Sequence, residues 1–192
     1  MRVISGRYKG RQIHSVKGAW LRPTSDRNRE FIFSYLGNWM EGAVVLDLFA
    51  GTGALGIEAM SRGAAAVTFV DFMPAAVQIM ERNLQELEIA GHVFRREAIS
   101  FIKWAAKRSC RYDIIFCDPP YRYQETEQLL TAVVSGALLR PGGLFVYETG
   151  SREPLPAAAG WNIHKDKHLG DTRVLFYERK DGEQDRDLSG IL

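Results

Sequence analysis

The sequence predicts an α/β fold, with a mostly parallel sheet that is flanked by helices and closed by a C-terminal antiparallel hairpin. From Gly42 onward, short apolar runs typical of buried strands alternate with longer segments typical of helices, which indicates parallel strands joined by crossover helices. The last two strand candidates have no convincing helix between them, so we expect them to pair as a hairpin. A chain of 192 residues is long enough for one such domain with a continuous core.

The segment before this alternation is expected to form two elements. Residues 1–22 consist of short runs punctuated by glycines, and they predict a small, basic β arm. A helix is expected to begin at Thr24 or Ser25, either of which can cap it, and to run to about Met40. Asp26 then lies in the first turn of that helix, where a carboxylate interacts favourably with the helix dipole.

The alternating part predicts one domain over residues 23–180, followed by an acidic tail. The expected strands span residues 44–49, 67–71, 93–96, 114–117, 144–148, 161–165 and 173–178. Four helices are expected between the strands. The first ends near residue 62, and the others span residues 74–87, 99–107 and 125–139. Residues 181–192 hold four acids and few apolar groups, so we expect this tail to be frayed.

The composition, with 46% hydrophobic and 25% charged residues, is typical of a soluble globular protein. The longest nearly apolar stretch, residues 129–139, is too short to span a membrane, and the start of the chain turns polar at once, so we expect a cytoplasmic location. Two cysteines are too few for a disulfide framework, and the four histidines show no ligand spacing, so no metal is expected. No unclaimed apolar stripe indicates a partner surface, which favours a monomer.

Positive charge is concentrated at the N-terminus. Residues 1–40 carry eight basic and two acidic side chains, a local balance of +6, whereas the rest of the chain sums to −4. Such a basic segment is typical of a surface that binds the phosphate backbone of a nucleic acid, but also of a solvated segment without a partner. Charge alone leaves both interpretations open.

A glycine-rich loop joins the first sheet strand to its helix. Gly51, Gly53 and Gly56 satisfy the G-x-G-x-x-G pattern, and Asp71 follows at the end of the next strand. Asp47 precedes the loop, where a carboxylate would be unfavourable beside the anionic pyrophosphate of a dinucleotide. It suits a cofactor that carries positive charge there, as the sulfonium and ammonium groups of S-adenosylmethionine do.

The fourth strand ends in Asp118-Pro119-Pro120-Tyr121, at the sheet edge where open α/β folds place their chemistry. The two prolines hold the chain extended, which leaves the Asp118 carboxylate and the Pro119 carbonyl as fixed acceptors. Such a pair can hold the exocyclic amino group of a nucleic-acid base and expose its nitrogen to an electrophilic methyl group. Tyr121 offers a flat surface on which a base removed from its helix can stack.

These motifs resemble those of class I methyltransferases that act on amino groups. Three N-terminal motifs narrow the resemblance: Arg2-Val3-Ile4-Ser5-Gly6, Lys9-Gly10-Arg11 and Arg22-Pro23-Thr24-Ser25-Asp26-Arg27. With them, residues 1–180 resemble the bacterial 16S ribosomal RNA guanine-N2 methyltransferases. The resemblance implies a seven-stranded sheet, S-adenosylmethionine as cofactor with S-adenosylhomocysteine as product, and 16S rRNA as partner, within a small ribosomal subunit or an assembly intermediate.

The resemblance also implies residue roles. The methionine end of the cofactor would be lined by Asp47, Gly51 and Gly53, and the ribose would be held by Asp71. Phe49 and Asp118 would also contact the cofactor. Catalysis would rest on Asp118, Pro119, Pro120 and Tyr121, which hold the guanine amine. RNA contacts would come from six basic side chains: Arg2, Arg7, Lys9, Arg11, Arg22 and Arg27.

The chain departs from the family pattern at two places. Glu97-Ala98 stands where many relatives carry Asp or Asn to meet the cofactor's adenine, a contact that we expect Glu97 to make with its longer side chain. Asn28 stands where an apolar residue is usual, which raises the question of how the first helix packs.

Other functions are consistent with parts of the sequence. The Asp-Pro-Pro-Tyr motif does not separate guanine N2 from adenine N6 in DNA or RNA, or from the amide of a protein glutamine. A dinucleotide-dependent oxidoreductase would leave the two prolines and the tyrosine unexplained, and a nucleic-acid-binding module with an inactive site is a further alternative. Cys117 lies in an apolar strand and is expected to be a buried core thiol rather than a nucleophile.

Overall fold

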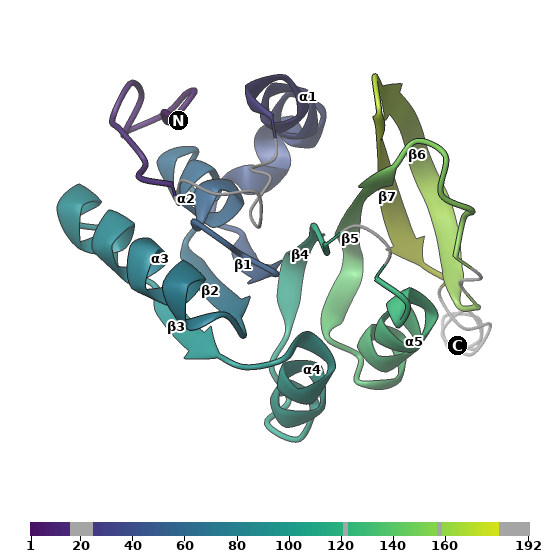
Figure 1. Cartoon of the computed structure of the whole chain (residues 1–192). Coiled ribbons are helices and arrows are strands. Elements are labelled where there is room, and N and C mark those ends of the chain that lie inside the picture. The colour runs from purple at the N-terminus through teal and green to yellow at the C-terminus, as the bar shows by residue number, and fades with distance from the viewer. Residues whose placement is uncertain (16–24, 121–122, 157–158, 181–192) are drawn as a thin grey trace, which may run out of the picture.

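The computed structural model describes residues 1–15, 25–120, 123–156 and 159–180. Its centre is a seven-stranded sheet with the strand order β3-β2-β1-β4-β5-β7-β6 (Figure 1). The strands are β1 (Val44–Leu48), β2 (Ala66–Asp71), β3 (His92–Arg95), β4 (Tyr112–Cys117), β5 (Leu139–Gly150), β6 (Trp161–Leu169) and β7 (Thr172–Arg179). The helices are α1 (Asp26–Leu36), the 3-10 helix η1 (Gly37–Met40), α2 (Ala54–Ser61), α3 (Pro74–Leu87), α4 (Ala98–Ala106) and α5 (Thr126–Ser135).

The pairing of the strands confirms the predicted fold class. Strands β1 to β5 pair in parallel, while β7 runs antiparallel to both β5 and β6. The last two strands form the expected C-terminal hairpin, with β6 at the outer edge of the sheet (Figure 1).

Helices cover both faces of the sheet and create two hydrophobic cores. The first core contains apolar side chains of α1, α2 and α3, and the second contains those of α4 and α5. Successive residues of β1 alternate between the two: Val45 belongs to the first core and Leu46 to the second. Because both faces are buried, the central strands read as continuous apolar runs rather than as an alternation of apolar and polar residues.

The strand order reverses between β1 and β4. From β1 the chain builds outward to β2 and β3, and from β4 it builds outward to β5 on the other side. Ligands of open α/β sheets bind in the crevice beyond the carboxyl ends of the strands at such a switch point. The residues that follow β1 and β4 therefore occupy the expected place for a binding site, and Leu48 pairs there with Cys117.

The N-terminal segment has less β structure than predicted. Within residues 1–15 the β pairing consists of an isolated bridge between Arg2 and Gln12, because Gly6 and Gly10 adopt left-handed turns between them. The segment is fastened to the body of the protein: the backbone N–H groups of Ile4 and Ser5 donate to the Glu58 carboxylate of α2, over 2.8 and 3.0 Å. Residues 16–22 of the predicted arm, and the tail 181–192, lie outside the described residues.

Several element boundaries differ from the prediction, most clearly those of α1, α5, β5 and β6, which extends to Leu169. Ser25 caps α1 as expected, since its Oγ accepts a hydrogen bond from the N–H of Asn28. The α-helix ends at Leu36, because Gly37 adopts a positive φ of 47°. The chain then forms the 3-10 helix η1 up to Met40. Helix α5 ends at Ser135 before Gly136, and β5 begins earlier than predicted, with an irregularity in its pairing with β4. Within the described ranges, no helix has the length and apolarity to cross a membrane.

Candidate active site

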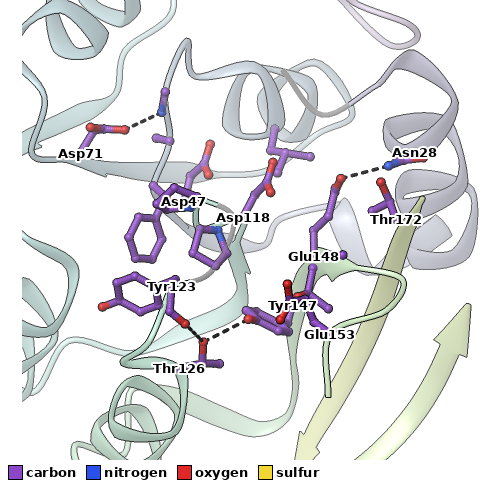
Figure 2. A pocket seen from close by; sticks show the side chains of 18 of the residues that line it. Asn28, Asp47, Asp71, Asp118, Tyr123, Thr126, Tyr147, Glu148, Glu153 and Thr172 are labelled. Carbon is purple, nitrogen blue, oxygen red and sulfur yellow. Dashed lines mark hydrogen bonds between the residues drawn. The ribbon is translucent and has the colours of Figure 1, made fainter. Parts of the chain in front are cut away.

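A cavity of about 600 Å³ opens at the carboxyl ends of β1, β2, β4 and β5 (Figure 2). Its volume lies within the usual range of small-molecule and cofactor sites. Six carboxylate side chains line it: Asp47, Asp71, Asp118, Glu127, Glu148 and Glu153. Among the residues that the structure describes, no lysine, arginine or histidine lines this cavity.

The glycine-rich loop forms one wall of the cavity. Gly51 and Gly53 have positive φ values of 55° and 79°, and Gly53 caps α2. Gly56 serves packing instead, since a Cβ atom there would lie 2.2 Å from the Phe69 ring of β2. The loop glycines thus provide a tight turn and a close contact between α2 and the sheet, as in nucleotide-binding βα units.

Asp47 lies at the buried end of the cavity. Its side chain is 1% exposed, and its Oδ2 accepts a hydrogen bond from the Gly56 N–H over 2.9 Å. Burial, together with the neighbouring carboxylates of Asp118 and Asp71, raises the pKa of Asp47 to about 8 despite the lowering effect of the Gly56 hydrogen bond. A cationic ligand placed here would favour the ionised form of Asp47.

Asp71, at the end of β2, connects the glycine-rich loop with the loop that follows β2. Its Oδ2 accepts from the Gly51 N–H over 2.9 Å (Figure 2). Its Oδ1 accepts from the Met73 N–H, also over 2.9 Å. These bonds fix the carboxylate in the cavity wall while each oxygen retains a lone pair for a ligand. Its place agrees with the predicted ribose contact, which remains a prediction.

The motif after β4 lies in the same cavity. Asp118, Pro119 and Pro120 all line it, together with Asp47 and Phe49. Tyr121 lies outside the described residues. Asp47 and Asp118 face the same side of the sheet, because Asp47 pairs with Phe116 and Asp118 follows two residues later.

Phe49 and Tyr123 form an aromatic wall that the sequence analysis recognised only in part. Phe49 adopts a positive φ of 58°, unusual for a residue with a side chain, and its ring lies 5.0 Å from that of Tyr123. Both residues line the cavity, and burial raises the pKa of the Tyr123 hydroxyl above its ordinary value. No motif in the sequence singled out Tyr123, which lies two residues after the Tyr121 of the Asp-Pro-Pro-Tyr motif.

Glu97 lies beside a second, smaller cavity of about 230 Å³ that shares Phe49, Asp71 and Tyr123 with the first. Both of its carboxylate oxygens cap α4, accepting from the N–H groups of Ile99 and Ser100 over 2.9 and 2.8 Å. The side chain therefore has a structural task as an N-cap. Ala98 follows it in the same wall, and the predicted adenine contact remains a prediction.

The predicted RNA-binding side chains lie on the surface as far as the structure describes them. Five of them are exposed: Arg2, Arg7, Lys9, Arg11 and Arg27. Arg22 lies outside the described residues. Arg29 behaves differently, because its guanidinium is fully buried and donates to the backbone carbonyl of Arg2 and to Asp26 over 2.8 and 2.7 Å. Part of the N-terminal positive charge therefore serves packing.

The polar residue at position 28 has a clear partner. Asn28 is 4% exposed, and its Nδ2 donates a hydrogen bond of 2.9 Å to Oε1 of Glu148, which is itself 9% exposed (Figure 2). Both line the cavity. Helix α1 thus packs through a buried polar pair with β5, and Glu148 is a site residue that the sequence analysis missed.

Cys117 is buried, as expected of a core thiol, and burial raises its pKa well above the ordinary value. It is therefore unsuited to be a nucleophile. Among the described residues, no three His, Cys, Asp or Glu side chains are grouped so that they could hold a metal ion.

Comparison with known proteins matches residues 1–178 to the family model described as conserved hypothetical protein 95. The chain is 40% identical over 183 residues to the putative rRNA methyltransferase YlbH of Bacillus subtilis, covering 94% of this chain and all of the relative. It is 34% identical over 190 residues to ribosomal RNA small subunit methyltransferase D of Escherichia coli, covering 97% and 94%. Among solved structures, the putative methyltransferase yhhF from Escherichia coli superposes with a TM-score of 0.83 at 34% identity, covering 93% of this chain and 97% of that one.

Proposed function

Because the chain belongs to the conserved hypothetical protein 95 family, which includes ribosomal RNA small subunit methyltransferase D, we propose that it methylates small-subunit ribosomal RNA. The reaction that we propose transfers a methyl group from S-adenosylmethionine to the exocyclic N2 amine of a guanine in 16S rRNA. The observation that carries this proposal is the shared cavity: the glycine-rich loop, Asp47 and the Asp118-Pro119-Pro120 motif all line it.

The charge of the cavity supports S-adenosylmethionine over a dinucleotide. Six carboxylates and no basic side chain line the described part of the wall, which favours a cationic ligand and disfavours a pyrophosphate. Asp47 and the loop glycines would hold the methionine end, and Asp71 the ribose hydroxyls. When bound, this cofactor supplies an electrophilic methyl group on a positively charged sulfur.

The residues after β4 would position the acceptor. The Asp118 carboxylate and the Pro119 carbonyl accept the two hydrogens of the amine, which discourages delocalisation of its lone pair into the ring. As the N–C bond forms, the S–CH3 bond breaks and would leave S-adenosylhomocysteine. The methylated nitrogen is acidic and would release its proton to solvent, so a strong general base is unnecessary, and rate enhancement would come from in-line positioning and from electrostatics. The base must be unpaired or flipped to enter a pocket of this kind, which costs a few kcal/mol.

The exposed basic side chains of the N-terminal segment would contact the RNA backbone. Four of them, Arg2, Arg7, Lys9 and Arg11, lie within 15 residues of the chain start, and Arg27 lies on the first turn of α1. Ser15 and Ser25, which flank residues 16–24, line the cavity, whereas Arg7 and Arg11 are held at the last turns of α2 and α3. Phosphate contacts of this kind supply affinity and orientation rather than base specificity.

The test is a transfer assay with labelled S-adenosylmethionine. Acceptors are small ribosomal subunits, naked rRNA and DNA, all without prior base methylation, and products are identified as nucleosides by mass. The proposal predicts N2-methylguanosine from the ribosomal samples with the wild-type protein and none with Asp118→Ala. Label in N6-methyladenosine, in DNA or in protein would contradict the proposed acceptor.

The matched control is Glu81→Gln, which removes an exposed carboxylate of α3 and should leave the transfer unchanged. A wild-type protein that binds the cofactor but transfers no label to either form of the rRNA would also contradict the proposal.

A further inference from the structure

The carboxyl end of β5 places a second carboxylate next to Asp118. Strands β4 and β5 are parallel, and Cys117 of β4 pairs with Tyr147 of β5. The next residues along each strand are Asp118 and Glu148, and neighbouring strands lie about 4.8 Å apart with paired residues on the same face. Figure 2 shows Asp47, Asp118 and Glu148 in succession across the cavity that all three line.

The orientation of Glu148 is fixed by a residue from the other end of the chain. Asn28 donates its 2.9 Å hydrogen bond to Oε1 of Glu148, and both side chains are at least nine-tenths buried. Asn28 is itself held at the start of α1, where its N–H donates to Oγ of Ser25.

The hydrogen-bonding pattern of guanine matches two adjacent carboxylates. Beside the exocyclic amine on its Watson–Crick edge, guanine carries the N1–H donor, whereas adenine carries a lone pair at N1 beside its own amine. An ionised carboxylate only accepts hydrogen bonds. When the amine of the base is held at Asp118, the N1–H of guanine can donate a hydrogen bond to the Glu148 carboxylate. The N1 lone pair of adenine would instead be repelled by that carboxylate.

We propose that Glu148 accepts the N1–H of the guanine whose amine is held by Asp118, and that Glu148 thereby selects guanine over adenine. This inference rests on the proposed function and adds the base specificity that the Asp-Pro-Pro motif does not determine. Asn28 is the positioning residue that holds the Glu148 carboxylate toward the acceptor.

The experiment compares guanine with 2-aminopurine at the methylated position, after that position has been mapped with the wild-type protein. The two acceptor RNAs are made by ligation and differ only in this base. 2-Aminopurine keeps the exocyclic N2 amine but has a lone pair at N1 and lacks O6. The diagnostic quantity is the ratio of kcat/KM for the two RNAs, and its change in the Glu148→Gln variant.

Glutamine has nearly the volume of glutamate and can donate its amide hydrogens to a lone pair. We expect Glu148→Gln to lower kcat/KM for guanine and to reduce the preference for guanine over 2-aminopurine by about 10- to 100-fold, the usual range for a hydrogen bond to a charged group. Asn28→Leu should reduce the same preference by a smaller factor, and Glu81→Gln should leave it unchanged. Cofactor affinity, measured by calorimetry, should be retained in all three variants. Retained affinity would show that the variants are folded.

The outcomes separate the inference from the function on which it rests. If the wild-type protein forms N2-methylguanosine but Glu148→Gln slows both RNAs by the same factor, Glu148 is only structural and the inference is wrong. If the wild-type protein forms no N2-methylguanosine, the proposed function itself is wrong, and the role assigned to Glu148 fails with it.

Discussion

Replacing Asp47 by asparagine is expected to stabilise the ligand-free protein at neutral pH. Burial raises the pKa of Asp47 from 3.8 to about 8, so between these values the folded protein holds a proton that the unfolded chain has released. The free energy of unfolding therefore falls as the pH rises through this range, by up to about 1.4 kcal/mol per pH unit from this group. Asparagine imitates the protonated side chain, and its Oδ1 can still accept the Gly56 N–H.

The size of the effect follows from the same pKa. From pH 5 to pH 7, Asp47 is ionised in the unfolded chain and protonated in the folded protein, so the wild-type protein loses up to about 3 kcal/mol of unfolding free energy that Asp47→Asn does not lose. Urea denaturation of both proteins without cofactor measures this difference, and Glu81→Gln controls for loss of an exposed carboxylate. A difference between wild type and Asp47→Asn that stays constant from pH 5 to pH 7 would refute this reasoning.

The same substitution should weaken cofactor binding. The ionised Asp47 attracts the cationic end of S-adenosylmethionine, so the wild-type affinity should rise with pH between about pH 5 and pH 7, by at most tenfold per unit. Asp47→Asn should bind more weakly at pH 7 and show little of this slope. Titration calorimetry measures the cofactor affinity at pH 7 and its change with pH. If the affinity of both proteins changes equally with pH, Asp47 does not contact the cofactor.

Three further predictions concern packing, catalysis and RNA binding. Gly56→Ala places a Cβ atom against the buried Phe69 ring and should lower the free energy of unfolding by about 1–3 kcal/mol; an unchanged denaturation midpoint would contradict the packing role. Asp118→Asn should lower the single-turnover rate of methyl transfer about 100-fold, and a rate within twofold of wild type would exclude a catalytic role. Lys9→Gln should weaken RNA binding and reduce the slope of log affinity against log salt by about one, whereas an unchanged slope would show that Lys9 meets no phosphate.

The sequence predicted those parts of the fold that depend on neighbouring residues. The local periodicity of apolar residues predicts the alternation of strands and helices. The turn around Gly51 and Gly53 needs residues that tolerate positive φ, which glycines do. Asp47, Asp71 and Asp118 could be assigned to one site because each lies within one residue of the carboxyl end of a parallel strand, and such ends share an edge of the sheet.

What the sequence did not predict depends on contacts between distant segments. Asn28 and Glu148 are 120 residues apart, and their contact depends on how α1 packs against the sheet and on the register of β5. Arg29 counted as surface charge in the sequence, yet its fully buried guanidinium joins α1 to the N-terminal segment through the carbonyl of Arg2. No local pattern distinguishes such residues from solvated polar side chains.

The most direct test of the proposed reaction identifies the bond that is formed. Small-subunit rRNA is prepared with 15N in the exocyclic amine of its guanines and incubated with S-adenosylmethionine that carries a 13C methyl group. The proposed function predicts a one-bond coupling between 13C and 15N in the isolated methylguanosine, present with the wild-type protein and missing with Asp118→Ala. A 13C methyl group on adenosine, or on any guanine atom other than this nitrogen, would contradict guanine-N2 methylation.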